Sequence, residues 1–222
     1  MTSLSLDQQI DAVLFDMDGT LIESEDRTDH AITELLSKYS IDTENGLELA
    51  RYHGVTWAAI AQSLVDEYPI PVHASVALDL QRAFHQTFVT QPPNPIPGAV
   101  ETIRRTAQSL PVGIVTSSNR ETLALVCDQL KITGLVSVRV CAEDCIRSKP
   151  SPEPYLLAAE RLNVNPDNCL IFEDSAAGVS AGLAAGGMVI AVGSESGHKP
   201  WINDFLSLPS DFFTFKSEQP YE

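Results

Sequence analysis

The chain has 222 residues, enough for one α/β domain with a substantial core, or for such a core carrying a small inserted domain. Its hydrophobic content of 44% and charged content of 20% are typical of soluble globular proteins. The formal net charge of -16 repels nucleic-acid phosphates and anionic lipid, so neither nucleic acid nor membrane is expected as a partner. The sequence has no basic opening followed by an apolar run and no bilayer-length apolar stretch, so we expect a cytoplasmic protein. No heptad pattern stands out, and we expect a monomer or a weak homodimer.

The first predicted element is a short buried strand over residues 12–15, which are all apolar. Two carboxylates, Asp16 and Asp18, follow it directly, and Gly19 then allows the chain to turn away sharply. Two acids in one crevice at the end of a buried strand cannot both stay ionised without a cation or a shift in pKa. Because Thr20 and Leu21 complete the string, we interpret the pair as a site rather than as a plain Asp-Gly turn.

A helical segment follows, from the acidic opening at residues 23–26 to about residue 91. Apolar faces at helical spacing run through it, and no strand-like alternation interrupts them. It closes at residues 91–98, where four prolines exclude a helix or a central strand and predict a semi-rigid connector. We therefore expect a helical cap with its connector at 23–95, inserted in a core made of 1–22 and 96–222.

Beyond the connector, helices alternate with near-continuous apolar strands, the pattern of a parallel sheet covered on both faces. We predict helices over 99–109, 120–130, 154–162 and 176–185, and strands over 112–115, 136–140, 169–172 and 188–192. The predicted fold class is α/β, with a Rossmann-like, three-layer parallel-sheet core and an inserted helical cap domain. In such sheets the active site lies at the carboxyl ends of the strands.

Polar side chains gather at these predicted strand ends. The hydroxyl and amide run at residues 116–119 offers donors to an anion, although such residues more often cap helices. Lys149, held in a rigid turn by Pro150 and Pro152, would neutralise a phosphoryl group and a neighbouring aspartate. Glu173 and Asp174 add a second acidic pair. Hard oxygen ligands without His or Cys favour Mg²⁺ as the cation.

Four strings in this order resemble the motifs of the haloacid dehalogenase (HAD) superfamily of phosphoryl-transfer enzymes. They are Asp16–Leu21, Thr116–Asn119, Ser148–Pro152 and Phe172–Gly178. The long insertion between the first two strings resembles the helical-cap subgroup, which includes phosphoglycolate phosphatase-like and β-phosphoglucomutase-like enzymes. The resemblance covers residues 11–193 of the core well and is only architectural in the cap.

The resemblance also implies a division of roles. Asp16 would be the nucleophile that takes the phosphoryl group as an aspartyl phosphate, and Asp18 the general acid and then the general base. Asn119 would either help to bind phosphate or cap the next helix. The implied phosphate-binding residues are Thr116, Ser117, Ser118 and Lys149, and the implied Mg²⁺ site comprises Asp16, the main-chain carbonyl of Asp18, Asp174, and Glu173 as a ligand or close neighbour.

Substrate choice is expected to lie in the cap. The resemblance places residues 51–57 facing the core, where Arg51 and His53 could contact a polar substrate and Trp57 could stack on a sugar. Trp57 could equally begin a helix and pack within the cap. β-Phosphoglucomutases carry a histidine twelve residues after the nucleophile and an arginine three residues after a cap-loop glycine, where this chain has Thr28 and Trp57. Both departures disfavour a mutase, and Asp18 disfavours a dehalogenase, which lacks the second aspartate.

We therefore predict a Mg²⁺-dependent phosphatase that hydrolyses a small phosphorylated metabolite, with a sugar phosphate favoured. Two alternatives stay open. One is a β-phosphoglucomutase-like phosphosugar mutase. The other is a catalytically weak protein that keeps the fold for binding or regulation.

Overall fold

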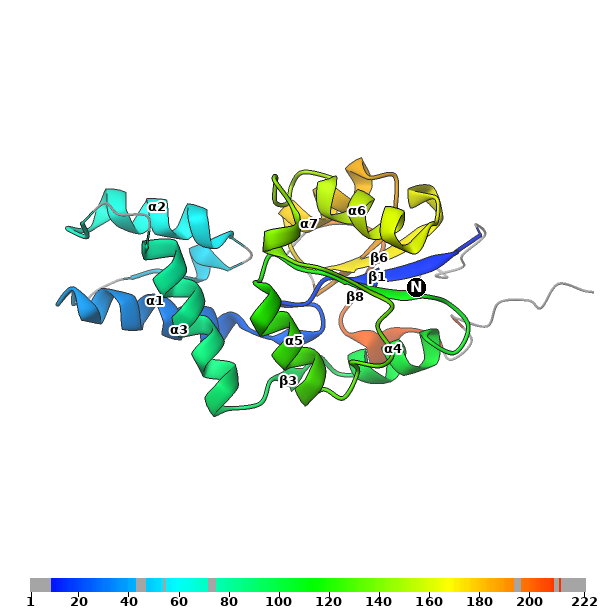
Figure 1. Cartoon of the computed structure of the whole chain (residues 1–222), viewed down its shortest axis with the longest axis horizontal. Coiled ribbons are helices and arrows are strands. Elements are labelled where there is room, and N and C mark those ends of the chain that lie inside the picture. The colour runs from blue at the N-terminus through cyan, green and yellow to red at the C-terminus, as the bar shows by residue number, and fades with distance from the viewer. Residues whose placement is uncertain are drawn as a thin grey trace, which may run out of the picture.

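The structure is a computed structural model that describes residues 9–42, 47–53, 55–71, 75–193, 197–209 and 212. Within these residues, six strands form one parallel sheet in the order β5-β4-β1-β6-β7-β8. Helices α6 and α7 cover one face of the sheet, and α4 and α5 cover the other (Figure 1). This three-layer arrangement confirms the predicted α/β class. The strands are β1 (Ala12–Phe15), β4 (Val112–Val115), β5 (Val138–Val140), β6 (Cys169–Glu173), β7 (Met188–Val192) and β8 (Trp201–Ile202), and the helices are α4 (Ala99–Thr106), α5 (Arg120–Gln129), α6 (Glu153–Leu162) and α7 (Ala176–Ala184).

Strand β1 is buried on both faces because its apolar side chains alternate between the two helical layers. Val13 and Phe15 belong to the core on the α4 and α5 side, whereas Ala12 and Leu14 belong to the core on the α6 and α7 side. The ring of Phe15 stacks on that of Phe172 with their centroids 5.2 Å apart. These contacts hold β1 at the centre of the sheet, between β4 and β6.

The register of these three strands brings their carboxyl ends together. Phe15 pairs with Ile114 of β4 and with Phe172 of β6, and the Asp16 amide then donates to the Phe172 carbonyl at 3.0 Å. The residues that follow each strand therefore meet at one edge of the sheet.

The predicted helical segment forms a separate unit of α1 (Glu25–Lys38), α2 (Trp57–Glu67) and α3 (Val76–Thr90) beside the sheet (Figure 1). Its interior includes the rings of Trp57, Phe84 and Phe88, with neighbouring centroids 5.0 and 5.1 Å apart. Helix α3 also packs on α5 of the core, where Gln129 donates to the Phe88 carbonyl at 2.8 Å. The cap-loop glycine, Gly54, lies outside the described residues.

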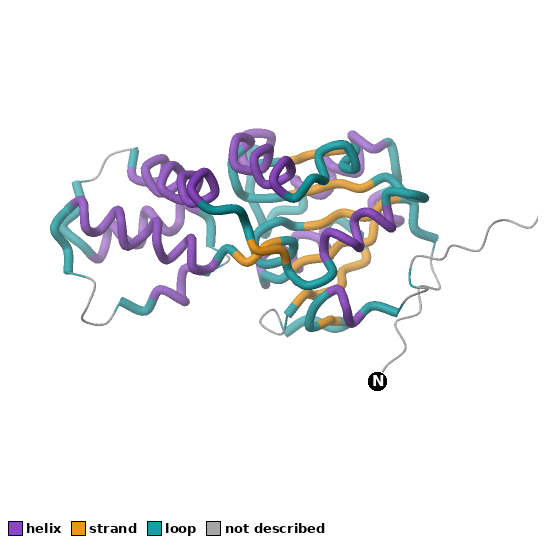
Figure 2. The backbone as a smooth tube through the Cα atoms, turned by 90° about the horizontal axis from the view of Figure 1, so that it is seen from below, coloured by secondary structure: helices purple, strands orange, loops and turns teal. Residues whose placement is uncertain are grey.

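The two chain crossings between the sheet and the helical unit pair with each other. Strand β2 (Ile22–Glu23) and strand β3 (Asn94–Pro95) form a short antiparallel ladder at this junction (Figure 2). The guanidinium of Arg27 donates to the Gln91 and Pro92 carbonyls at 3.1 and 2.7 Å and so anchors the proline-rich connector. The division into a core of 1–22 and 96–222 and a cap of 23–95 remains our proposal.

Among the described residues, no helix is both long enough and apolar enough to cross a membrane.

Candidate active site

Asp16 lies at the carboxyl end of β1, at the bottom of the cleft between the core and the cap. Its side chain is almost fully buried, and its Oδ1 accepts a hydrogen bond from Lys149 Nζ at 2.5 Å. Burial raises the pKa of Asp16 well above the ordinary aspartate value, although the Lys149 ammonium opposes this shift. A cation bound beside Asp16 would therefore strongly favour the ionised form of its carboxyl group.

Lys149 enters the site from the loop before α6, and three acceptors satisfy its ammonium group. Its Nζ donates to Asp16 Oδ1 at 2.5 Å, to Glu173 Oε1 at 2.6 Å and to the Val115 carbonyl at 2.9 Å. An ammonium group has three hydrogens, so this geometry fixes its position completely. Burial alone would lower the pKa of Lys149, but the carboxylates of Asp16 and Glu173 raise it above the usual value. Lys149 is a fixed positive charge beside Asp16.

Glu173 is fully buried, and both of its oxygens are engaged. Oε1 accepts from Lys149 and from the Tyr155 hydroxyl at 2.9 Å, while Oε2 accepts from the Ser175 amide at 3.1 Å and the Ser175 hydroxyl at 3.2 Å. Gly178 makes room for this carboxylate, since a Cβ there would lie 1.7 Å from Glu173 Oε1. Glu173 therefore positions Lys149.

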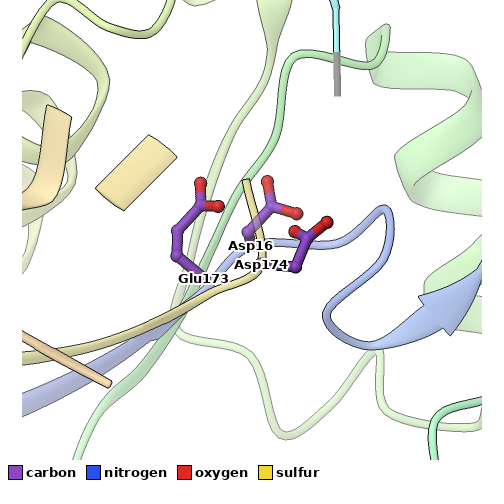
Figure 3. A group of neighbouring side chains, drawn as sticks. All are labelled: Asp16, Glu173 and Asp174. Atoms are coloured by element: carbon purple, nitrogen blue, oxygen red, sulfur yellow. The ribbon is translucent and has the colours of Figure 1, made fainter. Parts of the chain in front are cut away.

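Asp16, Glu173 and Asp174 together form a cluster that could hold a metal ion. Each offers a carboxylate oxygen, and these oxygens all lie within 4.8 Å of one another (Figure 3). Asp174 accepts from the Thr20 hydroxyl at 3.0 Å and packs against Gly19, where a Cβ would lie 2.1 Å from Asp174 Oδ2. Burial, aided by Glu173, raises the pKa of Asp174 to about 7. An oxygen-only donor set with buried, destabilised negative charge fits Mg²⁺.

Asp18 occupies a different environment from Asp16. Its Oδ2 accepts from the hydroxyls of Ser118 at 2.7 Å and Thr116 at 3.2 Å. Its Oδ1 is buried and has no hydrogen-bond partner among the described residues. Burial raises the pKa of Asp18, whereas the bonds from Ser118 and Thr116 lower it. Asp18 is thus suited to carry a proton, whereas the carboxylate of Asp16 is paired with the Lys149 ammonium.

The cleft has a volume of about 420 Å³ and collects most of the residues predicted from the sequence. Ser117 lines it beside Thr116 and Ser118, and His53 and Trp57 line it from the cap. Trp57 begins α2 and its ring packs on Phe84 inside the cap, as one of the two expectations had it; stacking on a sugar stays a prediction. The predicted residues that line the cleft are Asp16, Asp18, His53, Trp57, Thr116, Ser117, Ser118, Lys149 and Asp174.

Two predicted binding residues are not brought into the cleft. The guanidinium of Arg51 bonds instead to Glu67 and to the Tyr52 hydroxyl on the surface of the cap. Asn119 caps α5, because its Oδ1 accepts from the Thr122 amide at 2.8 Å. Of the two roles considered for Asn119, the structure shows the cap.

Thr20, Tyr155 and Ser175 support the site although the sequence pattern predicted no role for them. Each lies within one of the four motif segments or a few residues after it. Thr20 follows the aspartate pair, Tyr155 comes three residues after Pro152, and Ser175 follows Asp174. Their position beside the motifs is the available signal. The partners of Thr20 and Tyr155 lie on other segments of the chain, whereas Ser175 bonds to Glu173, two residues before it.

The comparisons with known proteins agree with this geometry. The family of haloacid dehalogenase-like hydrolases matches residues 10–186, which include all four strings and the whole cluster around Asp16. The chain belongs to this family. The predicted resemblance to the HAD superfamily and the prediction of a hydrolase are thereby confirmed.

Individual relatives of this HAD-like hydrolase include enzymes named as phosphatases. The bifunctional riboflavin kinase/FMN phosphatase of Arabidopsis thaliana is 33% identical over 201 residues, which are 86% of this chain and 51% of that protein, so the chain spans about half of that relative. Hexitol phosphatase A of Escherichia coli (strain K12) is 34% identical over 187 residues, which are 82% of this chain and 83% of that protein. Among solved structures, the HAD hydrolase of family IA, variant 3, from Entamoeba histolytica superposes with a TM-score of 0.79 at 20% identity, covering 91% of this chain and 97% of that chain. The last similarity shows the shared fold.

Proposed function

We propose that this hydrolase is a Mg²⁺-dependent phosphatase that cleaves a small phosphorylated metabolite through an aspartyl phosphate on Asp16. One observation carries the proposal. Two carboxylates that lie two residues apart directly after β1 have different surroundings, since Asp16 accepts from an ammonium group and Asp18 accepts from hydroxyls with one oxygen unpaired. Such a pair suits one acid for attack and the other for proton transfer.

In the first step, Asp16 attacks phosphorus and the bond to the leaving oxygen breaks, while Asp18 gives that oxygen its proton. In the second step, Asp18 takes a proton from water, which attacks the phosphoryl group and releases inorganic phosphate and free Asp16. Lys149 would neutralise negative charge on the phosphoryl group as a fixed positive charge and keep Asp16 aligned, and the hydroxyls of Thr116 and Ser118 would turn from Asp18 to the substrate.

Asp16, Asp174 and the main-chain carbonyl of Asp18 would hold the Mg²⁺, with Glu173 beside them. When bound, the cation would neutralise negative charge on the phosphoryl group and on the carboxylates. Glu173 already accepts four hydrogen bonds, so Asp16 and Asp174 are the acids with more freedom to ligate. Tyr155 and Ser175 would keep Glu173, and through it Lys149, in place.

The proposed substrate is a sugar or sugar-alcohol monophosphate. Hexitol phosphatase A is one relative whose name supports this class. In the cleft, Trp57 offers a flat ring for a sugar, and His53 offers a polar contact. Thr28 stands where β-phosphoglucomutases carry a histidine, and Trp57 stands where they carry an arginine that grips phosphate, so hydrolysis is favoured over phosphoryl transfer back to the sugar.

The test is a phosphometabolite panel with Mg²⁺, in which inorganic phosphate and isomer formation are both measured. Phosphate release from sugar phosphates, lost in Asp16→Asn with an unchanged circular dichroism spectrum, is the expected result. Conversion of a hexose 1-phosphate to its isomer without phosphate release would show a mutase instead. Failure to hydrolyse p-nitrophenyl phosphate with any divalent cation would support a binding or regulatory role.

A further inference from the structure

Arg27 is a buried cation at the junction between the core and the cap. It lies in the first turn of α1, and its exposed fraction is only 9%. Its guanidinium donates to a hydroxyl and two carbonyls, and no carboxylate pairs with it in the part of the chain that the structure describes. Burial lowers the pKa of Arg27, yet a guanidinium stays charged in proteins. A buried charge without a counter-charge is costly, so its position depends on the dipoles that replace its water.

These dipoles all belong to the end of α3 and to the start of the connector. One nitrogen of the guanidinium donates to Thr87 Oγ1 at 3.2 Å and to the Gln91 carbonyl at 3.1 Å, and the other donates to the Pro92 carbonyl at 2.7 Å. The guanidinium carbon lies 4.1 Å from the centroid of the Phe88 ring. Because a planar guanidinium fixes the directions of its partners as well as their distances, Arg27 joins the start of α1 rigidly to the end of α3.

Apolar packing contributes little at the junction itself. A cavity of about 550 Å³ opens there, and residues from both chain crossings line it. Its wall includes Glu23 of β2, Asn94 of β3, Arg27 and Gln91. Polar side chains around a hollow space bury little apolar surface, so the bonds of Arg27 and the β2–β3 ladder hold the two crossings together.

The two helices that Arg27 joins also form part of the cap wall of the cleft. Thr28, the residue after Arg27, lines the cleft from α1, and Phe84, one turn before Phe88, lines it from α3. Helix α1 is attached to the core through β2, whereas α3 is attached through α5, where Gln129 donates to the Phe88 carbonyl at 2.8 Å. Arg27 links these two attachments, so it controls how the two sides of the cap wall lie relative to the core.

We propose that Arg27 is a positioning residue, which holds the cap wall at the distance from Asp16 that phosphoryl transfer requires. This inference rests on the proposed phosphatase function and adds the residue that aligns its two halves. Without the guanidinium, α1 and α3 shift relative to each other at the junction, while Asp16 keeps its own bond to Lys149. A misplacement of about 1 Å caused far from the chemistry can lower a rate by as much as roughly a hundredfold.

The experiment compares Arg27→Gln and Arg27→Lys in the full chain, with p-nitrophenyl phosphate and Mg²⁺ as the probe. Glutamine removes the charge, whereas lysine keeps it without the planar fork. At a temperature where circular dichroism shows both variants folded, we expect kcat/KM to fall roughly tenfold in Arg27→Gln and roughly threefold in Arg27→Lys. Arg82→Gln is the matched control, because Arg82 lies on the exposed surface of α3 and pairs with Asp79. Its kcat/KM should equal that of the wild type.

A spectroscopic readout separates positioning from a simple loss of stability. The chain has two tryptophans, so in a Trp201→Phe background the fluorescence comes from Trp57 alone. Trp57 lines the cleft and is 9% exposed. Acrylamide should quench Trp57 more strongly in folded Arg27→Gln than in the parent protein, with Arg27→Lys in between and Arg82→Gln like the parent.

Unchanged kcat/KM or unchanged quenching in folded Arg27→Gln would overturn the inference, and so would an equal effect of Arg82→Gln. Unfolding of both Arg27 variants would show a purely structural role and would overturn it as well. Absence of p-nitrophenyl phosphate hydrolysis in the wild type marks failure of the phosphatase proposal instead, and the quenching of Trp57 then still decides whether Arg27 positions the cap.

Discussion

Replacing Tyr155 by phenylalanine would remove one oxygen from the buried chain of hydrogen bonds that holds Lys149. The Tyr155 hydroxyl donates to Glu173 Oε1, and Glu173 in turn accepts from Lys149. Burial raises the pKa of Tyr155 well above its usual value, so the hydroxyl stays protonated and donates throughout the neutral range. The ring itself packs under the ammonium, with Lys149 Nζ 5.0 Å from its centroid, and phenylalanine keeps that contact.

The size of the effect follows from the partners that remain. A hydrogen bond to a buried charged group contributes about 1.5–3 kcal/mol, and Glu173 keeps its bonds from Lys149 and Ser175. We therefore expect Tyr155→Phe to lower the free energy of unfolding by about 1.5 kcal/mol. With this bond lost, Glu173 also holds Lys149 less firmly. If this destabilises the transition state by the same free energy, kcat falls roughly tenfold.

The assay pairs denaturant unfolding with steady-state hydrolysis of p-nitrophenyl phosphate. A fall in kcat with little change in KM would show that Tyr155 acts through the alignment of Lys149. Tyr68→Phe is the control, since it removes a tyrosine hydroxyl from the cap at the end of α2. Lower stability with unchanged kcat would refute the positioning role, and no change in either quantity would refute the hydrogen-bond chain.

Three further predictions concern the metal site and the support of the sheet edge. Gly19→Ala places a Cβ 2.1 Å from Asp174 Oδ2 at a φ of +80°, so the Mg²⁺ concentration for half activation should rise about tenfold, as a metal titration of activity would show. Removal of divalent cations with EDTA should lower activity about a hundredfold or more, and Mg²⁺ should restore it, whereas full activity in EDTA would exclude a metal role. Asp144→Asn weakens the bonds from Arg120 at 3.0 Å and Arg161 at 2.8 Å and should reduce stability at pH 7 by about 1–2 kcal/mol. Because the Arg161 bond holds the pKa of Asp144 well below its usual value, this stabilisation exists above the unfolded-state pKa and is lost as pH falls, so the melting temperatures of variant and wild type should converge below about pH 4.

The fold and the core of the site could be predicted because their signals are local. The apolar run at 12–15 marks a buried strand, and its neighbours in the sheet are recognisable in the same way. Since parallel strands end at one edge, residues following different strands can be placed together without knowing any side-chain contact. This reasoning predicts that Asp16, Asp18, Lys149 and Asp174 lie together.

The features that could not be predicted depend on the orientation of individual side chains and on their hydrogen-bond partners. Arg51 and His53 are two residues apart, yet Arg51 bonds to Glu67 on the surface, whereas His53 lines the cleft and bonds to Asp29 of α1. Neither partner is visible from the local pattern, because each lies on another segment of the cap. The same holds for Tyr155, whose hydroxyl meets Glu173 only after α6 has packed on the sheet.

The central claim is that the phosphoryl group passes through Asp16, and a single-turnover experiment with Asp18→Asn tests it most directly. p-Nitrophenolate leaves without needing a proton, so this variant should still phosphorylate Asp16, but the substituted asparagine cannot remove a proton from the attacking water. The expected result is one equivalent of p-nitrophenolate released in a burst, with one phosphoryl group found by mass spectrometry on the peptide that contains Asp16. No covalent adduct, or an adduct on a different residue, would contradict the claim.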